Sequence, residues 1–180
     1  MERPRNHRYR HGPMLRFGGI IILVVCVSCR TKVTPPLSQL AMTDQRSEKQ
    51  LIAGFWGLEE GKWRWTARRF AVVLIPPSGS KQTGATLRLQ FYIPRQQIEK
   101  LGPLTLSADV GESPLTPEKF TSGGTLTYTR DIPSSLIGPN MLPVVFNLDK
   151  ALDNTETDGR ELGIIVTSVS IEPSRVAAAR

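Results

Sequence analysis

Apolar and polar residues alternate along short segments of this chain from about residue 51 to residue 173. The clearest segment is 86–93, whose apolar positions are Leu87, Leu89, Phe91 and Ile93. Because successive side chains of a strand point to opposite faces, this spacing predicts a strand with one buried face. Residues 70–75 form a continuous apolar run that ends at Pro76. That run predicts a strand buried on both faces.

The same reasoning predicts about eight strands in all. They are expected at 53–59, 62–66, 70–75, 86–93, 104–110, 124–129, 144–148 and 162–171. Residues 95–101 are mostly polar and predict one or two helical turns. The connections are too short and too rich in proline and glycine for the crossover helices of a parallel sheet. We therefore expect an all-β protein, an antiparallel β-sandwich of jelly-roll type.

The first thirty residues carry the pattern of a secretory signal. Five arginines precede an apolar run of 13 residues, 17–29, whereas a helix that spans a bilayer needs about 20. This pattern predicts a signal peptide at residues 1–28. Ser28-Cys29 resembles the lipobox of bacterial lipoproteins, in which the cysteine is diacylated and becomes the first residue. An uncleaved anchor and cleavage with release remain alternatives, and a start at Met14 would give a signal of ordinary length.

The lipobox resemblance implies an exported protein that is anchored in the bacterial cell envelope, on the periplasmic side or at the surface. Residues 29–50 combine two adjacent prolines with polar and charged residues. They predict a flexible spacer behind the lipidated Cys29. Residues 51–173 form the predicted β-sandwich domain, and residues 174–180 form a short tail.

Charge and composition argue against several functions. The chain holds 23 Lys and Arg against 16 Asp and Glu, a net charge of +7. Removal of residues 1–28 takes away five arginines and Glu2 and leaves +3. The basic excess therefore belongs mainly to the signal and does not indicate a nucleic-acid partner.

The rare residues are confined to the N-terminal part of the sequence. Both histidines precede residue 12, and no cysteine follows Cys29. The predicted domain therefore lacks the residues for Ser-His-Asp catalysis, cysteine catalysis and His/Cys metal sites. We expect no enzymatic activity, no cofactor and no metal.

All three tryptophans lie within ten positions, at Trp56, Trp63 and Trp65. In a strand, Trp63 and Trp65 share one face, and Arg64 points to the other. A flat aromatic face with charged neighbours is suited to a sugar ring and its hydroxyls, so these residues are candidate glycan contacts. The alternative is that the indole rings fill the space between the two layers of the sandwich.

Arg160 is the second candidate for a ligand contact. It lies in the segment 158–163, ahead of the last apolar strand. Its guanidinium group can grip a carboxylate or a sugar of a ligand, or it can pin the final strand through an acidic partner. Glu59 and Glu60 do not make a catalytic pair, because adjacent strand residues point to opposite faces.

Four short segments form an ordered series: RWT at 64–66, LGPLTLSA at 101–108, RDIP at 130–133 and DGRELG at 158–163. The series resembles an uncharacterised bacterial β-sandwich domain that occurs in secreted or membrane-tethered proteins and beside glycosyltransferase modules. Over about residues 54–172, the resemblance implies a jelly-roll fold in a cell-envelope glycan context, and it supplies no catalytic residue.

Together these observations predict a non-catalytic envelope lipoprotein that binds a glycan or an envelope protein. The expected ligand contacts come from Trp56, Trp63, Trp65, Arg64 and Arg160. The alternative is a structural or assembly lipoprotein with no small-molecule ligand.

Overall fold

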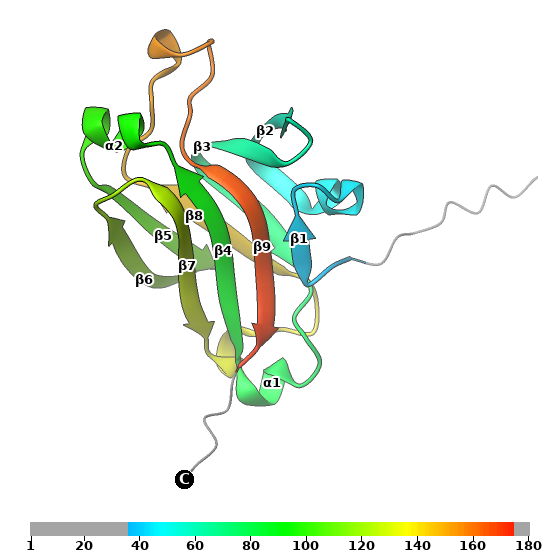
Figure 1. Ribbon diagram of the computed structural model, residues 1–180. Helices are drawn as coiled ribbons and strands as arrows, with labels where there is room; N and C mark the ends of the chain where they lie inside the picture. The colour runs from blue at the N-terminus through cyan, green and yellow to red at the C-terminus, as the bar shows by residue number, and fades with distance from the viewer. Residues whose placement is uncertain (1–35, 175–180) are drawn as a thin grey trace, which may run out of the picture. The chain divides into compact units, whose positions relative to one another are not determined.

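The computed structural model describes residues 36–174. The predicted signal peptide, Cys29 and most of the predicted tail lie outside these residues. The described chain forms nine antiparallel strands with short helices between them (Figure 1).

The strands are β1 (Gln39–Ala41), β2 (Leu51–Glu59), β3 (Trp63–Leu74), β4 (Ala85–Ile93), β5 (Leu104–Val110), β6 (Ser113–Phe120), β7 (Gly124–Ile132), β8 (Leu142–Leu148) and β9 (Ile165–Pro173). The α-helices are α1 (Ser80–Thr83) and α2 (Arg95–Leu101), and the 3-10 turns are η1 (Gln45–Gln50), η2 (Ser134–Leu136) and η3 (Asn154–Glu156).

The strands belong to one sheet that bends over itself into two layers (Figure 1). Along the sheet the order is β6-β5-β8-β3-β9-β4-β7, and β1 pairs with β9 while β2 pairs with β3. One layer holds β7, β4 and β9, and the other holds β3, β8, β5 and β6. The prediction of an antiparallel all-β fold is confirmed. Its jelly-roll part is not confirmed, because the two layers are continuous through β3 and β9.

Strand β3 pairs in both layers. Near its start Arg64 lies opposite Val166 of β9, and further along Phe70 lies opposite Phe146 of β8. The two strands predicted at 62–66 and 70–75 are therefore a single strand. The polar residues between them do not break it, because they lie where β3 changes its partner and where side chains are exposed.

Strand β6 has no alternation that predicts it. Its exposed positions are Pro114, Thr116, Pro117 and Lys119, and only Leu115 and Phe120 are buried. It is the terminal strand of the sheet, and an edge strand tolerates proline because its outer N–H groups need no partner strand.

Residues 36–50 belong to the folded domain, so the predicted flexible spacer is wrong for this segment. Strand β1 pairs with β9, and Leu40 is 0% exposed. The side chain of Gln50 fixes the segment against β3. It accepts a hydrogen bond from Leu37 N (2.6 Å) and donates to Leu37 O (3.0 Å) and Val73 O (2.6 Å). A strand of three residues is too short to give a recognisable pattern in the sequence.

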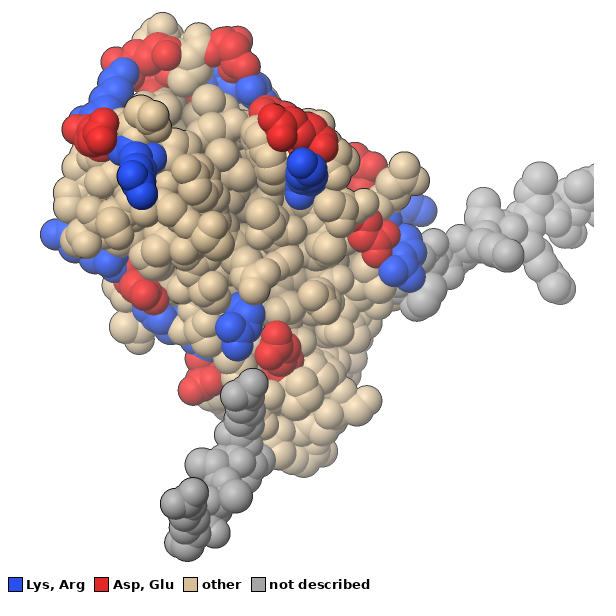
Figure 2. Space-filling model, viewed as in Figure 1, with Lys and Arg blue, Asp and Glu red and all other residues tan. Residues whose placement is uncertain are grey.

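The outer face of the β7-β4-β9 layer is mostly uncharged (Figure 2). In register, Gln90 of β4 lies between Thr127 of β7 and Ser168 of β9, and the Ser168 hydroxyl donates to Gln90 Oε1 over 2.8 Å. Charged residues lie nearer the margins, some of them in opposite-sign pairs such as Arg88–Glu172 at 3.5 Å. This is the polar outer surface of an antiparallel sheet with one buried face.

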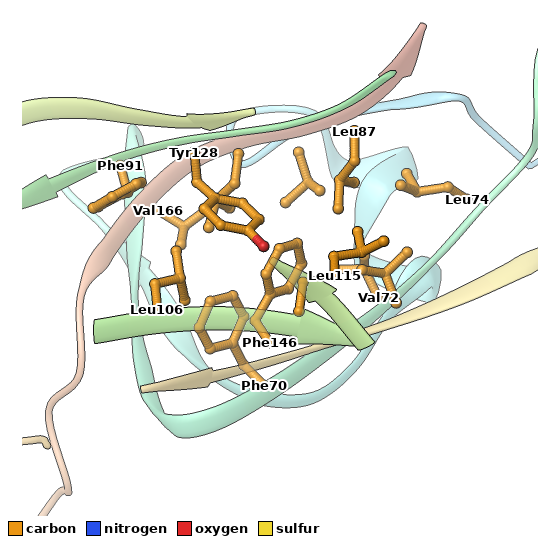
Figure 3. Packing of buried hydrophobic residues seen from close by; sticks show 14 of the residues in the cluster. Phe70, Val72, Leu74, Leu87, Phe91, Leu106, Leu115, Tyr128, Phe146 and Val166 are labelled. Carbon is orange, nitrogen blue, oxygen red and sulfur yellow. The ribbon is translucent and has the colours of Figure 1, made fainter. Parts of the chain in front are cut away.

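The hydrophobic core fills the space between the layers (Figure 3). Phe91 and Tyr128 face it from one layer, and Phe70 and Phe146 face it from the other. The rings of Phe70 and Phe146 stack with their centroids 4.9 Å apart. Leu87, Leu89, Phe91 and Ile93 are all buried, so the alternation in segment 86–93 identified its core face correctly.

Side chains join the two end strands of the sheet, β6 and β7. The Tyr128 hydroxyl donates to Thr116 O over 2.9 Å, and Arg130 Nε donates to the same oxygen over 2.7 Å. Arg130 also pairs with Glu118 at 2.8 Å. An open sheet edge invites pairing with other chains, and these contacts occupy part of that edge.

The run 70–75 is buried on one face only. Its buried residues are Phe70, Val72 and Leu74. Ala71, Val73 and Ile75 are partly exposed on the other face. The prediction of two buried faces is wrong because no element of the described chain covers the outer face of β3.

The burial of β1 gives a direct test of the corrected domain boundary. Leu40→Ala removes a side chain that is 0% exposed, and we expect it to lower the free energy of unfolding by about 2–5 kcal/mol. Gln39→Ala changes the exposed neighbour in the same strand and should alter it by less than about 0.5 kcal/mol. Urea unfolding followed by circular dichroism measures both. Equal stability of the two variants would show that β1 does not belong to the folded domain and would support the predicted flexible spacer.

Candidate functional site

A cleft beside Trp65 is the strongest candidate for a binding site. Its volume is about 270 Å³, and it lies between strand β3, helix α2 and the loop that carries η3. The lining residues are Trp65, Pro94, Gln96, Gln97, Lys100, Leu152, Glu156 and Leu162. We call it the Trp65 cleft. Its wall combines an aromatic ring, aliphatic side chains and a few polar groups, as small-ligand sites generally do.

Strand β3 fixes the position of Trp65. The residue pairs with Ile165 of β9 and is half-buried. Trp63 lies two positions earlier on the same face, and the two rings meet edge to face with centroids 6.5 Å apart. The predicted sharing of one face by Trp63 and Trp65 agrees with this contact. Of these two tryptophans, only Trp65 lines the cleft.

Helix α2 forms the opposite wall. Pro94 ends β4, and the helix ends at Gly102, whose φ of +73° favours glycine. Between them the Gln97 side chain points into the protein and is 2% exposed. Gln97 Nε2 donates to Gly163 O (2.5 Å) and to Leu162 O (3.4 Å). These bonds tie the helix to the start of the last strand.

The other end of the Gln97 amide has no partner among the described residues. Its Oε1 atom is buried and accepts no hydrogen bond. Exchanging the oxygen and nitrogen of the Gln97 amide would not give both atoms partners. Both neighbouring groups are carbonyl oxygens, which need the nitrogen as donor. A buried acceptor without a donor costs about 1–3 kcal/mol. Gln97 belongs to the lining of the cleft, but its Oε1 is buried, so a ligand donor would reach this acceptor only after neighbouring side chains moved.

An ion pair joins the two sides of the cleft. Lys100 Nζ on α2 lies 2.7 Å from Glu156 Oε2 on η3, and both side chains are about half exposed. The η3 turn is held locally by Asp153, whose carboxylate accepts from Thr155 N and Thr155 Oγ1 at 2.9 and 2.8 Å. The loop is closed at its base by a bridge between Leu152 and Leu162. Charged groups of both signs are therefore available beside the aromatic wall.

Trp56 and Arg160 form a second cluster outside the cleft. Trp56 Nε1 donates to Glu161 O over 2.8 Å, and the Arg160 guanidinium lies 6.0 Å from the centre of the Trp56 ring. Arg160 also contacts Glu59 Oε1 at 2.7 Å and holds Asp158 through two nitrogens. Arg160 thus binds an acidic residue of β2 and one of its own loop, and these contacts hold the loop against β2. We call this cluster the corner.

Hydrogen bonds within this corner shift the pKa values of its charged groups. The bonds from Arg160 lower the pKa of Asp158 below its ordinary value of 3.8. The bonds to Asp158 and Glu59 raise the pKa of Arg160. Both groups therefore stay charged at neutral pH.

Arg64 points away from the Trp63–Trp65 face, as strand alternation predicts. Its Nη1 donates to Trp56 O over 3.1 Å, and its Nη2 lies 3.4 Å from Glu48 Oε1. The side chain is 13% exposed, and its Nε is buried without a partner among the described residues. The five predicted ligand contacts thus divide into Trp63 with Trp65, Trp56 with Arg160, and Arg64 against β2.

No model of a known protein family matches this sequence, and comparison with curated proteins finds no match. Within residues 36–174, no three His, Cys, Asp or Glu side chains lie close enough to hold a metal ion. None of the helices in that part of the chain is long and apolar enough to cross a membrane.

Acid pH should release the Asp158–Arg160 contact. Because the pKa of Asp158 is lowered in the folded state, its stabilising contribution is fully present above pH 3.8 and is lost as the pH falls through the lowered value. Wild type and Asp158→Asn are compared by urea unfolding between pH 2 and pH 6. We expect the stability difference to be constant near neutrality and to disappear in acid.

The same comparison in an Arg160→Gln background is the control. There Asp158 has lost its partner, so Asp158→Asn should have a much smaller effect at every pH. An equal effect in both backgrounds would show that Arg160 does not hold Asp158.

Proposed function

We propose that this protein is a non-catalytic lipoprotein, anchored in the bacterial cell envelope through Cys29, whose β-sandwich binds a glycan in the Trp65 cleft. The observation that carries the glycan part is the Trp65 ring, which lines one cleft together with the polar side chains of Gln96, Lys100 and Glu156. A sugar presents an apolar ring face and hydroxyl donors at its edge. These two features match the aromatic wall and the polar side chains of the cleft.

The cleft favours a short glycan segment over a long one. Its volume of about 270 Å³ lies just below the roughly 300–1,000 Å³ of most small-molecule sites. One stacked ring with a few hydrogen bonds gives weak affinity, because binding must also offset the lost translational and rotational freedom. Anchoring many copies on one membrane would compensate through multivalency, provided that the glycan is a polymer.

A paired substitution tests the site. Trp65→Leu removes the aromatic wall, and Trp63→Leu makes the same change two residues away, outside the cleft lining. Stacking on an aromatic side chain is worth about 1–3 kcal/mol in nucleic-acid complexes, which corresponds to roughly 5- to 150-fold in affinity. We expect this loss for Trp65→Leu and a much smaller change for Trp63→Leu. Calorimetric titration with a panel of envelope polysaccharide fragments measures it.

Thermal unfolding of each variant separates lost binding from lost folding. If folded wild-type protein binds no fragment of the panel, or if Trp65→Leu binds as well as wild type, the glycan proposal is wrong. Failure of wild type to bind any fragment would favour the alternative, a structural or assembly lipoprotein. The Trp56 hydrogen bond to the loop backbone is consistent with that alternative, because it gives one tryptophan a structural role.

Anchoring has its own test. Cys29→Ser removes the thiol that would carry the lipid, whereas Cys26→Ser changes the neighbouring cysteine of the same apolar run. Wild type and Cys26→Ser should partition into the detergent phase of a cell extract and carry labelled fatty acid. Cys29→Ser should carry none and should accumulate as a precursor or a water-soluble form. Unchanged processing and lipid labelling of Cys29→Ser would contradict the lipoprotein assignment.

A further inference from the structure

A second surface remains unexplained by the glycan site. On the outer face of the β3-β8 layer, Ala71 lies opposite Val145 and Val73 lies opposite Pro143. Ile75 and Met141 come directly after and before the last pair of this register, and both line one shallow cleft. We call these six residues the apolar outer face. Pro143 and Met141 are exposed and the others are partly exposed, with Met141 at 50%.

At its Ile75 end, the apolar outer face extends into a shallow cleft. This open cleft is lined by Val73, Ile75, Pro139, Asn140, Met141 and Pro143. Toward β5 the surface becomes polar, where Asn147 Nδ2 donates to Asp109 Oδ2 over 2.9 Å. A grouped apolar surface with a polar margin is typical of a contact site.

The start of the described chain is fixed beside this face. Ile75 N donates to Leu37 O over 3.1 Å, and the Gln50 side chain binds both Leu37 and Val73. The polypeptide therefore leaves the folded domain at the Ile75 end of the apolar outer face. Gln50 is 5% exposed, so this attachment belongs to the packed structure.

Only seven residues, 30–36, separate Cys29 from Leu37. A fully extended chain covers about 3.3–3.6 Å per residue, so the eight steps from Cys29 to Leu37 reach at most about 29 Å. An anchor at Cys29 therefore holds the Ile75 end of the domain close to the bilayer. The same limit applies to an uncleaved anchor, because its apolar run also ends at Cys29.

We propose that the apolar outer face lies against the phospholipid surface. This inference rests on the anchoring part of the proposed function. Arg69 is exposed on the same strand two residues before Ala71. Lys81 lines a separate pocket whose wall also includes Ile75 and Pro139. These two cations suit anionic headgroups at the margin of the apolar contact. Short-range docking of this kind adds apolar burial to the lipid anchor and sets the orientation of the domain.

Site-specific quenching in membranes tests the contact. Full-length protein with Met141→Cys is labelled with an environment-sensitive fluorophore and reconstituted into vesicles of phosphatidylethanolamine and phosphatidylglycerol. Thr127→Cys, exposed on the outer face of the other layer, is the matched control. Wild type, treated in the same way, gives the background from native cysteines. We expect the position-141 probe to shift to the blue and to lose most of its emission to brominated acyl chains, while the position-127 probe does neither.

A charged substitution confirms the source of the quenching. Pro143→Asp alters an exposed residue of the apolar outer face. Added to Met141→Cys, it should abolish the quenching, while the protein still floats with the vesicles through its lipid. Quenching that survives Pro143→Asp would overturn docking through this face.

The remaining outcomes distinguish the two proposals. Protein that floats with neither probe quenched overturns docking and leaves the anchor intact. Protein that does not float overturns the anchor, and docking falls with it. A blue shift at position 141 without quenching by lipid means that protein covers the face, either a second copy or another partner, and this also overturns the bilayer contact.

Discussion

Both layers of this protein depend on one strand that pairs in each of them. Strand β3 leaves β9 and joins β8 around Thr66, which is 0% exposed. The backbone of Thr66 bonds Ile164 O (2.9 Å) and Gly163 N (2.6 Å). A Cβ at Gly163 would lie 2.7 Å from Ala67 O, so only glycine allows this approach. The loop that carries η3 leads into Gly163 and forms one wall of the Trp65 cleft, so the geometry of this junction positions both.

Local alternation predicted the strands that have one face in the core and the other in water. Segment 86–93 became β4 with the expected core face, because buried and exposed positions alternate there without interruption. The pattern failed where tertiary context changes the environment along one strand. In β3, Arg68 and Arg69 resemble a break but mark a change of partner. In β6 the prolines are tolerated by an edge position that only the completed sheet defines.

The candidate site was predictable only in part, because its walls meet through long-range contacts. The strand period placed Trp63 and Trp65 on one face and Arg64 on the other, and the contacts of these residues agree. Nothing in the sequence indicated Gln97, since a glutamine in a short polar helix ordinarily lies in solvent. Its burial follows from the bond to Gly163, 66 residues away. The local sequence around Arg160 could suggest an acidic partner but could not choose Glu59, 101 residues away.

The two buried amides, Gln50 and Gln97, differ in how many of their hydrogen-bonding groups have partners in the fold. Gln50 uses both ends of its amide, because its oxygen accepts from Leu37 N while its nitrogen donates to Leu37 O and Val73 O. A satisfied amide of this kind stabilises a fold and offers nothing to a ligand. Gln97 uses only its nitrogen, and its buried oxygen has no partner among the described residues. The unpaired oxygen is about 1–3 kcal/mol unfavourable by itself, so a hydrogen-bond donor that reached it, from water or from a ligand, would stabilise the domain.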